Sequence, residues 1–187
     1  MSSLAGVLIA AFALGSPSEK LNATGSATHY QIATLAGGCF WGLQEALRHI
    51  PGVIKTTVGY TGGTVPNPTY EQVGAGKTGH AEAVQVIFDP TKLSYEDLLY
   101  HFFQSHDPTS PQHQVIGRKT PYRSAIFYHS DEQRRIAERV MEQVSQSGKW
   151  TNPVVTEIAP ATEFYPAEAY HQDYLEKIAA HSCHAPD

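Results

Sequence analysis

A cysteine between glycines is the residue of this sequence best suited to chemistry. Cys39 lies in the segment Gly-Gly-Cys-Phe-Trp-Gly at residues 37–42, between a predicted strand at 31–36 and a predicted helix at 43–50. Glycines let the backbone turn sharply and leave room for a substrate. The N–H groups of a helix's first turn favour a thiolate, the form that attacks electrophiles. The alternative is a small buried hydrophobic residue, which is what most free cysteines are.

A second cysteine, Cys183, lies near the other end of the chain, and the sequence contains two cysteines in all. Two are too few for a disulfide scaffold or a four-cysteine zinc site. The pair could form one structural disulfide that joins the two ends. They could also have separate roles, as nucleophile and as the thiol that resolves its product.

Glu82 is the candidate acid. It has the same parity as Val84, Val86 and Phe88 in the predicted strand at 80–89, so it should point at the apolar face. A carboxyl group in an apolar wall tends to keep its proton and can then act as an acid near neutral pH. The alternative is an exposed glutamate at the start of the strand.

The elements that must position these residues follow from hydrophobic periodicity. Four strands besides the first and three helices besides the one after Cys39 are predicted. The strands are 53–60, 80–89, 124–128 and 154–158, and the helices begin at Ser94 and Ser130 and span 167–180. Strands and helices mix without the strict alternation of a doubly wound sheet. The sequence therefore predicts an α+β fold, a two-layer α/β sandwich around a mixed β-sheet of the ferredoxin-like plait.

Length and composition fit a single domain with short extensions. The chain has 187 residues, 41% of them hydrophobic and 17% charged, which is enough for a core without disulfides or metals. A net charge of -5 gives no basic surface, so no nucleic-acid partner is expected. We expect an extension and linker at 1–28, the catalytic domain at 29–180 and a tail at 181–187.

The first residues resemble part of an export signal. Leu4 to Leu14 form a nearly unbroken apolar run that is too short to span a bilayer, and small residues precede Ser16. A secretory signal normally has a Lys or Arg before its apolar run, and this sequence has none there. Export to the periplasm or medium and a cytoplasmic location with an ordinary extension therefore both stay open, and no stable membrane insertion is expected after any cleavage.

Six ordered blocks of this sequence resemble the peptide methionine sulfoxide reductase A family. The first is the Gly-Gly-Cys-Phe-Trp-Gly segment that contains Cys39. The other five are Asn-Pro-Thr-Tyr at 67–70, Gly-Lys-Thr-Gly-His-Ala-Glu at 76–82, His-Asp-Pro-Thr at 106–109, Tyr-Arg-Ser-Ala-Ile at 122–126 and Tyr-His-Gln-Asp-Tyr at 170–174. The resemblance spans residues 33–174.

The resemblance implies a thiol-dependent reductase that repairs oxidised proteins. Its substrate would be methionine S-sulfoxide, free or in proteins. Cys39 would attack the sulfur and become a sulfenic acid, and Cys183 would then form a disulfide with it that a thioredoxin-like donor reduces. No metal and no cofactor are expected, and we expect a monomer.

The resemblance also implies roles for the other site residues. Glu82 matches the acid, while Phe40 and Trp41 match the pocket for the substrate's methyl group. Three further polar residues match substrate-binding positions: Tyr70, Asp107 and Tyr122. The two tyrosines would donate to the sulfoxide oxygen, and Asp107 would hold water or the substrate's backbone amide.

Two features of this chain depart from the family pattern. Cys183 lacks the Asn-Gly-Tyr-like turn that often precedes the resolving cysteine, and residues 115–119 replace a turn usually rich in Gly, Asn and Asp. The second departure puts the placement of Asp107 in doubt.

Three other functions remain as alternatives. A metal site could use some of the ten histidines, with His181, Cys183 and His184 clustered in the tail. A cysteine hydrolase would need a histidine base, for which His80 is the candidate. A non-catalytic peptide-binding module could share the same fold.

Overall fold

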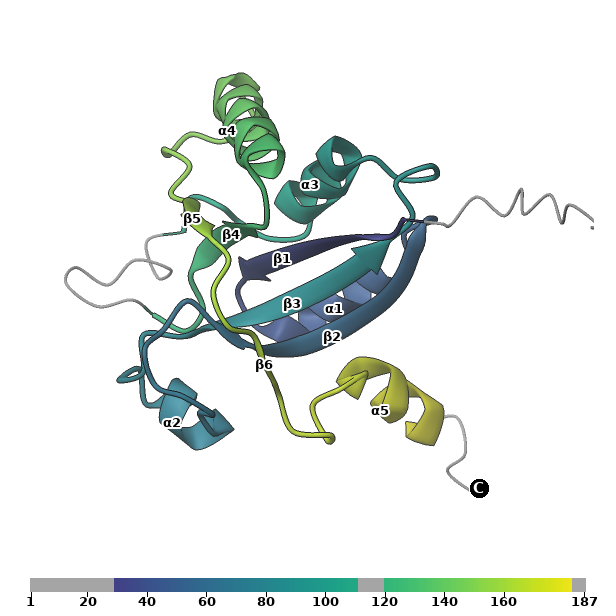
Figure 1. Cartoon of the computed structure of the whole chain (residues 1–187), viewed down its shortest axis with the longest axis vertical. Helices are drawn as coiled ribbons and strands as arrows, with labels where there is room; N and C mark the ends of the chain where they lie inside the picture. Colours follow the sequence, from purple (N-terminus) through teal and green to yellow (C-terminus); the bar gives the residue numbers. More distant parts are fainter. Residues whose placement is uncertain (1–28, 111–119, 183–187) are drawn as a thin grey trace, which may run out of the picture.

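The computed structural model describes residues 29–110 and 120–182. Its elements follow in the order β1, α1, β2, α2, β3, α3, β4, α4, β5, β6, α5 (Figure 1). The strands are β1 Gln31–Gly37, β2 Val53–Thr61, β3 Ala81–Phe88, β4 Ser124–Tyr128, β5 Glu157–Pro160 and β6 Tyr165–Pro166. The helices are α1 Phe40–Arg48, α2 Tyr70–Gly74, α3 Tyr95–Gln104, α4 Asp131–Gln146 and α5 Tyr174–Ser182.

The six strands form one mixed sheet in the order β5-β4-β1-β3-β2-β6. The central four strands are antiparallel to one another, and with α1 and α3 they reproduce the order of a ferredoxin-like βαββαβ unit. Strand β5 adds to β4 in parallel and β6 adds to β2 antiparallel. The predicted α+β fold is confirmed.

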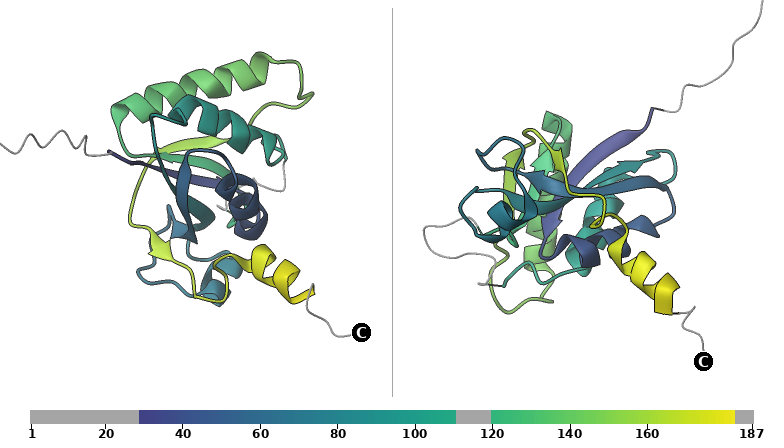
Figure 2. Two further views of the ribbon diagram at one scale, coloured as in Figure 1. Left: turned by 90° about the vertical axis from the view of Figure 1, so that its right-hand side faces the viewer. Right: turned by 90° about the horizontal axis from the view of Figure 1, so that it is seen from below.

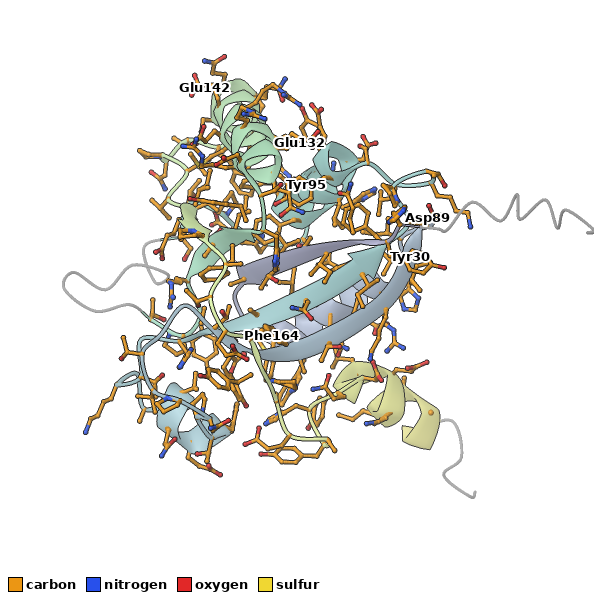
Figure 3. All side chains as sticks on the ribbon, in the orientation of Figure 1. Tyr30, Asp89, Tyr95, Glu132, Glu142 and Phe164 are labelled. Atoms are coloured by element: carbon orange, nitrogen blue, oxygen red, sulfur yellow. The ribbon has the colours of Figure 1, made fainter. Side chains whose placement is uncertain are left out.

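The two faces of the sheet are covered differently. Helices α1, α3 and α4 lie over one face, where alternate strand residues such as Leu35, Val84 and Val86 are fully buried (Figures 1 and 2). The segment between β5 and β6 crosses part of the other face over small residues such as Ala83 and Ala125. Phe164 of this segment lies against that face (Figure 3). The helical face is therefore the apolar one toward which Glu82 was predicted to point.

The C-terminal part of the chain differs from the prediction. The predicted helix at 167–180 begins only at Tyr174, the strand at 154–158 is found at Glu157–Pro160, and α2 and β6 were not predicted. Asp173 has φ 55, in the left-handed region, so a right-handed helix cannot run through it.

The segment before α5 is held against the sheet by side chains instead. The amide of Gln172 accepts from Val58 N at 3.0 Å and donates to Val58 O and Ala167 O at 2.9 Å each. Asp173 N donates to Gln44 Oε1 at 2.9 Å, and Gln44 Nε2 donates back to Asp173 Oδ1 at 3.0 Å. These bonds fix the end of this segment against β2 and the middle of α1.

Candidate active site

Cys39 sits at the turn between β1 and α1, as predicted. It is the N-cap residue of α1 and is exposed. Gly38 has φ 92, which favours glycine, and a Cβ on Gly37 would lie 3.0 Å from Phe102 Cε2 and 3.1 Å from His106 Cγ. A larger residue would therefore be strained at either position, and the turn places the Cys39 sulfur at the end of β1.

The electrostatics of Cys39 differ from the prediction. Desolvation raises the pKa of the Cys39 thiol above its ordinary value, and the negative charge of Glu82 raises it further. The N–H groups of Trp41 and Gly42 lower the pKa, as expected of a helix start, but they do not outweigh burial. The helix start therefore favours the thiolate as predicted, but desolvation and the Glu82 charge together outweigh it, so the pKa of the resting thiol is raised.

Glu82 lies on the helical face of β3 and is only 2% exposed, which confirms its predicted direction. Its neighbour across the sheet is Tyr60 of β2. Its Oε2 accepts a hydrogen bond of 3.1 Å from Phe40 N, the first amide of α1. Burial raises the pKa of Glu82 to about 7, while the Phe40 N–H acts in the opposite direction. The carboxyl is therefore about half protonated at neutral pH, beside the helix start that Cys39 caps.

Two tyrosines share the electrostatic environment of Cys39 and Glu82. Burial raises the pKa of Tyr70 and of Tyr122, and the charges of Glu82 and Cys39 add to the shift at both. Glu82 N donates to Pro121 O at 2.8 Å, which ties β3 to the residue before Tyr122. The structure thus brings together four of the predicted site residues, and both tyrosines keep a proton that they can donate.

The two aromatic residues after Cys39 have different surroundings. Phe40 is fully buried, whereas Trp41 is half-buried and stacks on Tyr174 with ring centroids 3.9 Å apart and planes 16° apart. Their predicted role as the methyl pocket stays a prediction.

Two predicted site residues are less well placed by the structure. Asp107 is exposed, and its Oδ1 accepts from Thr109 N at 2.9 Å and from Thr109 Oγ1 at 2.7 Å, as in a turn. Cys183 and residues 115–119 lie outside the described residues. The roles of Asp107 and Cys183 therefore stay predictions.

The structure also shows site residues that had no predicted role. Glu168 accepts from Tyr60 Oη at 2.8 Å and from Tyr70 N at 3.0 Å. His171 is 1% exposed and accepts from Trp41 Nε1 at 3.1 Å. The Tyr-His-Gln-Asp-Tyr block at 170–174 was the available signal, but its contacts span the whole chain and cannot be inferred from local pattern.

Comparison with known proteins adds an independent observation. A family model described as peptide methionine sulfoxide reductase matches residues 31–187. The peptide methionine sulfoxide reductase MsrA of Leifsonia xyli subsp. xyli is 52% identical over 155 residues, which is 82% of this chain and 89% of the relative. The chain belongs to the peptide methionine sulfoxide reductase family.

Solved structures agree with this family. The reduced form of Mxr1 from Saccharomyces cerevisiae has a TM-score of 0.71 and 36% identity, and the match covers 79% of this chain and 85% of that chain. Mxr1 in complex with Trx2 matches with a TM-score of 0.56 and 28% identity, over 79% and 86% of the two chains.

His80 cannot serve as the base that a cysteine hydrolase would need. His80 is 2% exposed, and both of its ring nitrogens contact backbone groups. Its Nδ1 accepts from Gly63 N at 3.1 Å, so Nε2 carries the proton and donates to Val65 O at 2.8 Å. No lone pair is left on the ring to take a proton from Cys39.

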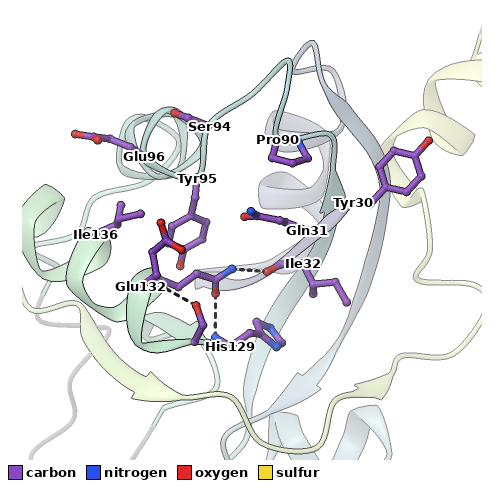
Figure 4. Close-up of a pocket in the computed structure, with 12 residues that line it drawn as sticks. Tyr30, Gln31, Ile32, Pro90, Ser94, Tyr95, Glu96, His129, Glu132 and Ile136 are labelled. Carbon is purple, nitrogen blue, oxygen red and sulfur yellow. Dashed lines mark hydrogen bonds between the residues drawn. The ribbon is translucent and has the colours of Figure 1, made fainter. Parts of the chain in front are cut away.

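The possibility of a metal site concerns the part of the reductase that the structure describes. It contains no group of three or more His, Cys, Asp or Glu that could hold a metal, and Cys183 and His184 of the tail cluster lie outside it. A groove of about 570 Å³ opens between the starts of α3 and α4, with Tyr95 and Glu132 among its lining residues (Figure 4). This groove includes the start of β1, the end opposite Cys39. Among residues 29–110 and 120–182, no helix is long and apolar enough to cross a membrane.

Proposed function

We propose that Cys39 is the nucleophile and Glu82 the acid of this methionine sulfoxide reductase. The observation that carries the proposal is the position of Glu82: its carboxyl is buried at the start of the helix that Cys39 caps, and its pKa is about 7. Such a group supplies a proton at neutral pH without a histidine.

In the first step a bond forms between Cys39 Sγ and the sulfoxide sulfur, and the S–O bond breaks. The oxygen leaves as water, which then attacks Cys39 Sγ. The bond between the two sulfurs breaks and a proton is released, so the thiol and methionine sulfoxide have become a sulfenic acid and methionine. Glu82 protonates the oxygen as negative charge develops there, with Tyr70 and Tyr122 as further donors. When Glu82 is protonated, its charge no longer raises the pKa of Cys39, and the N–H groups of Trp41 and Gly42 stabilise the thiolate as it forms.

In the second step the thiol of Cys183 attacks the sulfenic acid of Cys39, forming a disulfide and releasing water. A thioredoxin-like dithiol then reduces this disulfide by thiol–disulfide exchange and is itself oxidised. Support comes from the complex of the relative Mxr1 with Trx2 and from the chain itself, since Cys183 directly follows α5. Helix α5 begins at Tyr174, which stacks on Trp41 near Cys39.

The specificity for one epimer would come from the methyl pocket. Trp41 offers an apolar ring in the first turn of α1, two residues after Cys39. Glu82, Tyr70 and Tyr122 form a polar cluster that shares the electrostatic environment of Cys39. Cys39 attacks the sulfur from a third direction, so a sulfoxide whose oxygen meets the polar cluster and whose methyl group meets the ring can react with only one handedness at sulfur. We assign the S epimer from the family resemblance.

Single-turnover kinetics test the proposal. The reduced enzyme, mixed with excess methionine S-sulfoxide, should form methionine with loss of both thiols, whereas Cys39→Ser should form none and keep its fold. Cys183→Ser should form one methionine per enzyme and then stall with thioredoxin as reductant. Continuous turnover of Cys183→Ser with thioredoxin alone would show that Cys183 is not the resolving cysteine. Methionine formation by Cys39→Ser would remove the nucleophile assignment.

A further inference from the structure

The hydrogen bond between Trp41 and His171 joins two ends of the domain at the substrate site. An indole N–H can only donate, so Nδ1 of His171 must be the acceptor in the 3.1 Å contact. In the neutral ring the proton then lies on Nε2. Trp41 is in the first turn of α1, and His171 belongs to the irregular segment before α5.

Nε2 of His171 is an unusual group. It is buried and has no hydrogen-bond partner in the part of the chain that the structure describes. The ring packs among aromatic rings, with centroids 4.4 Å from Tyr70, 4.1 Å from Tyr170 and 5.2 Å from Phe40. A buried N–H without an acceptor is unfavourable, so an apolar ring would suit this position better unless the other nitrogen were needed.

Burial also keeps His171 in the form that can accept. Desolvation lowers the pKa of His171, although the charges of Glu168 and Glu71 act in the opposite direction. The neutral ring keeps its lone pair on Nδ1 available to the indole N–H at neutral pH.

The contacts on Trp41 are complementary. Tyr174 stacks on its face and restricts its tilt, but stacked rings can still slide in their own plane. A hydrogen bond at the edge of the indole restricts that sliding and turns its N–H away from the substrate. Without an acceptor the indole N–H would seek one in water or in the sulfoxide oxygen, and the wall facing the methyl group would become polar.

We infer that His171 is a positioning residue that fixes the indole of Trp41 through its Nδ1 atom and so keeps the methyl pocket apolar. This inference rests on the proposed role of Trp41 in substrate binding. His171 acts on the fit of the methyl group and not on the attack of Cys39, so its loss should raise KM far more than it lowers the maximal rate of reduction.

A matched pair of variants tests the role of Nδ1. His171→Phe keeps a ring and removes the acceptor, while in His171→Asn the amide oxygen takes nearly the position of Nδ1 and can still accept. Loss of one hydrogen bond in a buried site corresponds to roughly a tenfold change, so His171→Phe should raise KM for methionine sulfoxide about tenfold. Its saturating single-turnover rate should stay near that of the parent, and His171→Asn should return KM most of the way.

Tryptophan fluorescence gives a readout that does not depend on catalysis. The chain has two tryptophans, so Trp150→Phe leaves Trp41 as the only one without touching the site. In this background His171→Phe should shift the emission and shorten the anisotropy decay of Trp41, and His171→Asn should not. If His171→Phe does not fold, a benzothienyl analogue at Trp41, which replaces N–H by sulfur, should raise KM equally.

Two outcomes would overturn the inference. One is an unchanged KM and an unchanged Trp41 signal in His171→Phe or with the benzothienyl analogue. The other is an Asn variant as impaired as the Phe variant. Trp41→Leu separates this failure from that of the proposed pocket: if it leaves KM unchanged the pocket assignment is wrong, and if it alone raises KM the pocket stands without His171.

Discussion

Glu82 is held between two opposing influences. Apolar neighbours on the helical face of the sheet disfavour its charge, and the N–H of Phe40 at the start of α1 favours it. Burial is the stronger of the two, so the carboxyl keeps a proton at a pH where an exposed glutamate has lost it. Its partner across the sheet, Tyr60, is tied by its hydroxyl to Glu168, which also holds the first amide of α2.

The pH dependence of the first step follows from this pKa. With a pKa of about 7, the protonated fraction of Glu82 falls tenfold for each pH unit well above that value. Glu82→Gln should therefore lower the single-turnover rate by about 10²- to 10⁴-fold at pH 6, the usual range for loss of an acid, and by less at pH 8.5. Rapid-quench measurements of methionine formation check this. An equal deficit across the whole range would contradict the acid role.

Glu82→Gln should lower the rate but raise the stability of the folded protein at high pH. The folded-state pKa of Glu82 is raised from 4.5 to about 7, so its contribution to stability is full below pH 4.5 and lost as pH rises through 7. Because the neutral amide does not lose it, Glu82→Gln should be more stable than the parent at pH 8, by at most about 3 kcal/mol, and equally stable at pH 4. Urea unfolding at the two pH values measures the difference. A variant less stable at pH 8 would show that Glu82 is not desolvated.

Sequence periodicity predicts the direction of a single side chain better than its protonation state. The parity of Glu82 with Val84 was enough to place it on the apolar face, because a strand alternates its side chains. The pKa of Cys39 could not be predicted in this way. It depends on Glu82 from β3 and on protein atoms that crowd the sulfur, and both are brought there by the tertiary fold.

The segment from Ala161 to Asp173 is the element that completes the site. It crosses the sheet, pairs as β6 with Gly59 and Tyr60, and then places Glu168, His171 and Gln172. A Cβ on Gly59 would lie 2.4 Å from Tyr165 O and 2.6 Å from Phe164 Cζ, so the crossing requires glycine at that point.

Gly59→Ala should therefore displace this segment and cost about 1–3 kcal/mol, the usual range for overpacking. Trp41 fluorescence should change with it, because His171 and Tyr174 follow the displaced strand. The control is Gly74→Ala, at the end of α2, where a Cβ meets nothing within 4 Å and should stabilise by about 0.5–1 kcal/mol. Denaturant unfolding of the pair is the measurement, and equal effects would contradict the close approach.

The long helices can be predicted from the sequence, whereas the C-terminal region cannot. Helices α3 and α4 have apolar stripes and serine N-caps, which are local signals. Residues 167–173 have a helix-like pattern but are held by Gln172 to Val58 and by Asp173 to Gln44, more than a hundred positions away. Such long-range hydrogen bonds between side chains outweigh the local helix propensity. They cannot be predicted from the spacing of apolar residues.

The whole molecule uses its topology to gather distant residues at one end of the sheet. Strand β1 is central, between β3 and β4, so the turn at Cys39 lies beside the start of β3 with Glu82 and the start of β4 with Tyr122. The C-terminal segment then returns to the same end through β6. The order of the four antiparallel strands predicts that Cys39, Glu82 and Tyr122 lie at the same end of the sheet. It does not predict that the C-terminal segment returns to this end.

Two truncations should separate the roles of the C-terminal region. A chain ended at Ser182 keeps every described contact of α5 and should give one methionine per enzyme before it stalls with thioredoxin. A chain ended at Pro160 loses Glu168, His171 and Gln172 and should fail even in a single turnover, with KM raised or folding lost. Methionine yield per enzyme and circular dichroism distinguish them. Full activity of the shorter chain would contradict the proposed site.

The N-terminal extension leaves two alternatives open, export and a cytoplasmic location. Sequencing the first residues of the mature protein decides between them. Loss of residues 1–15 indicates export and an electron donor outside the cytoplasm, whereas a retained start indicates the cytoplasmic thioredoxin pool.

The raised pKa of Cys39 also bears on which oxidants the enzyme meets safely. Hydrogen peroxide and alkylating agents react with thiolates, and burial together with the Glu82 charge holds the resting sulfur in its thiol form at neutral pH. A sulfoxide differs from these reagents because its oxygen takes up the proton that Glu82 carries. We therefore expect the resting Cys39 to react more slowly with hydrogen peroxide than an ordinary exposed thiol does.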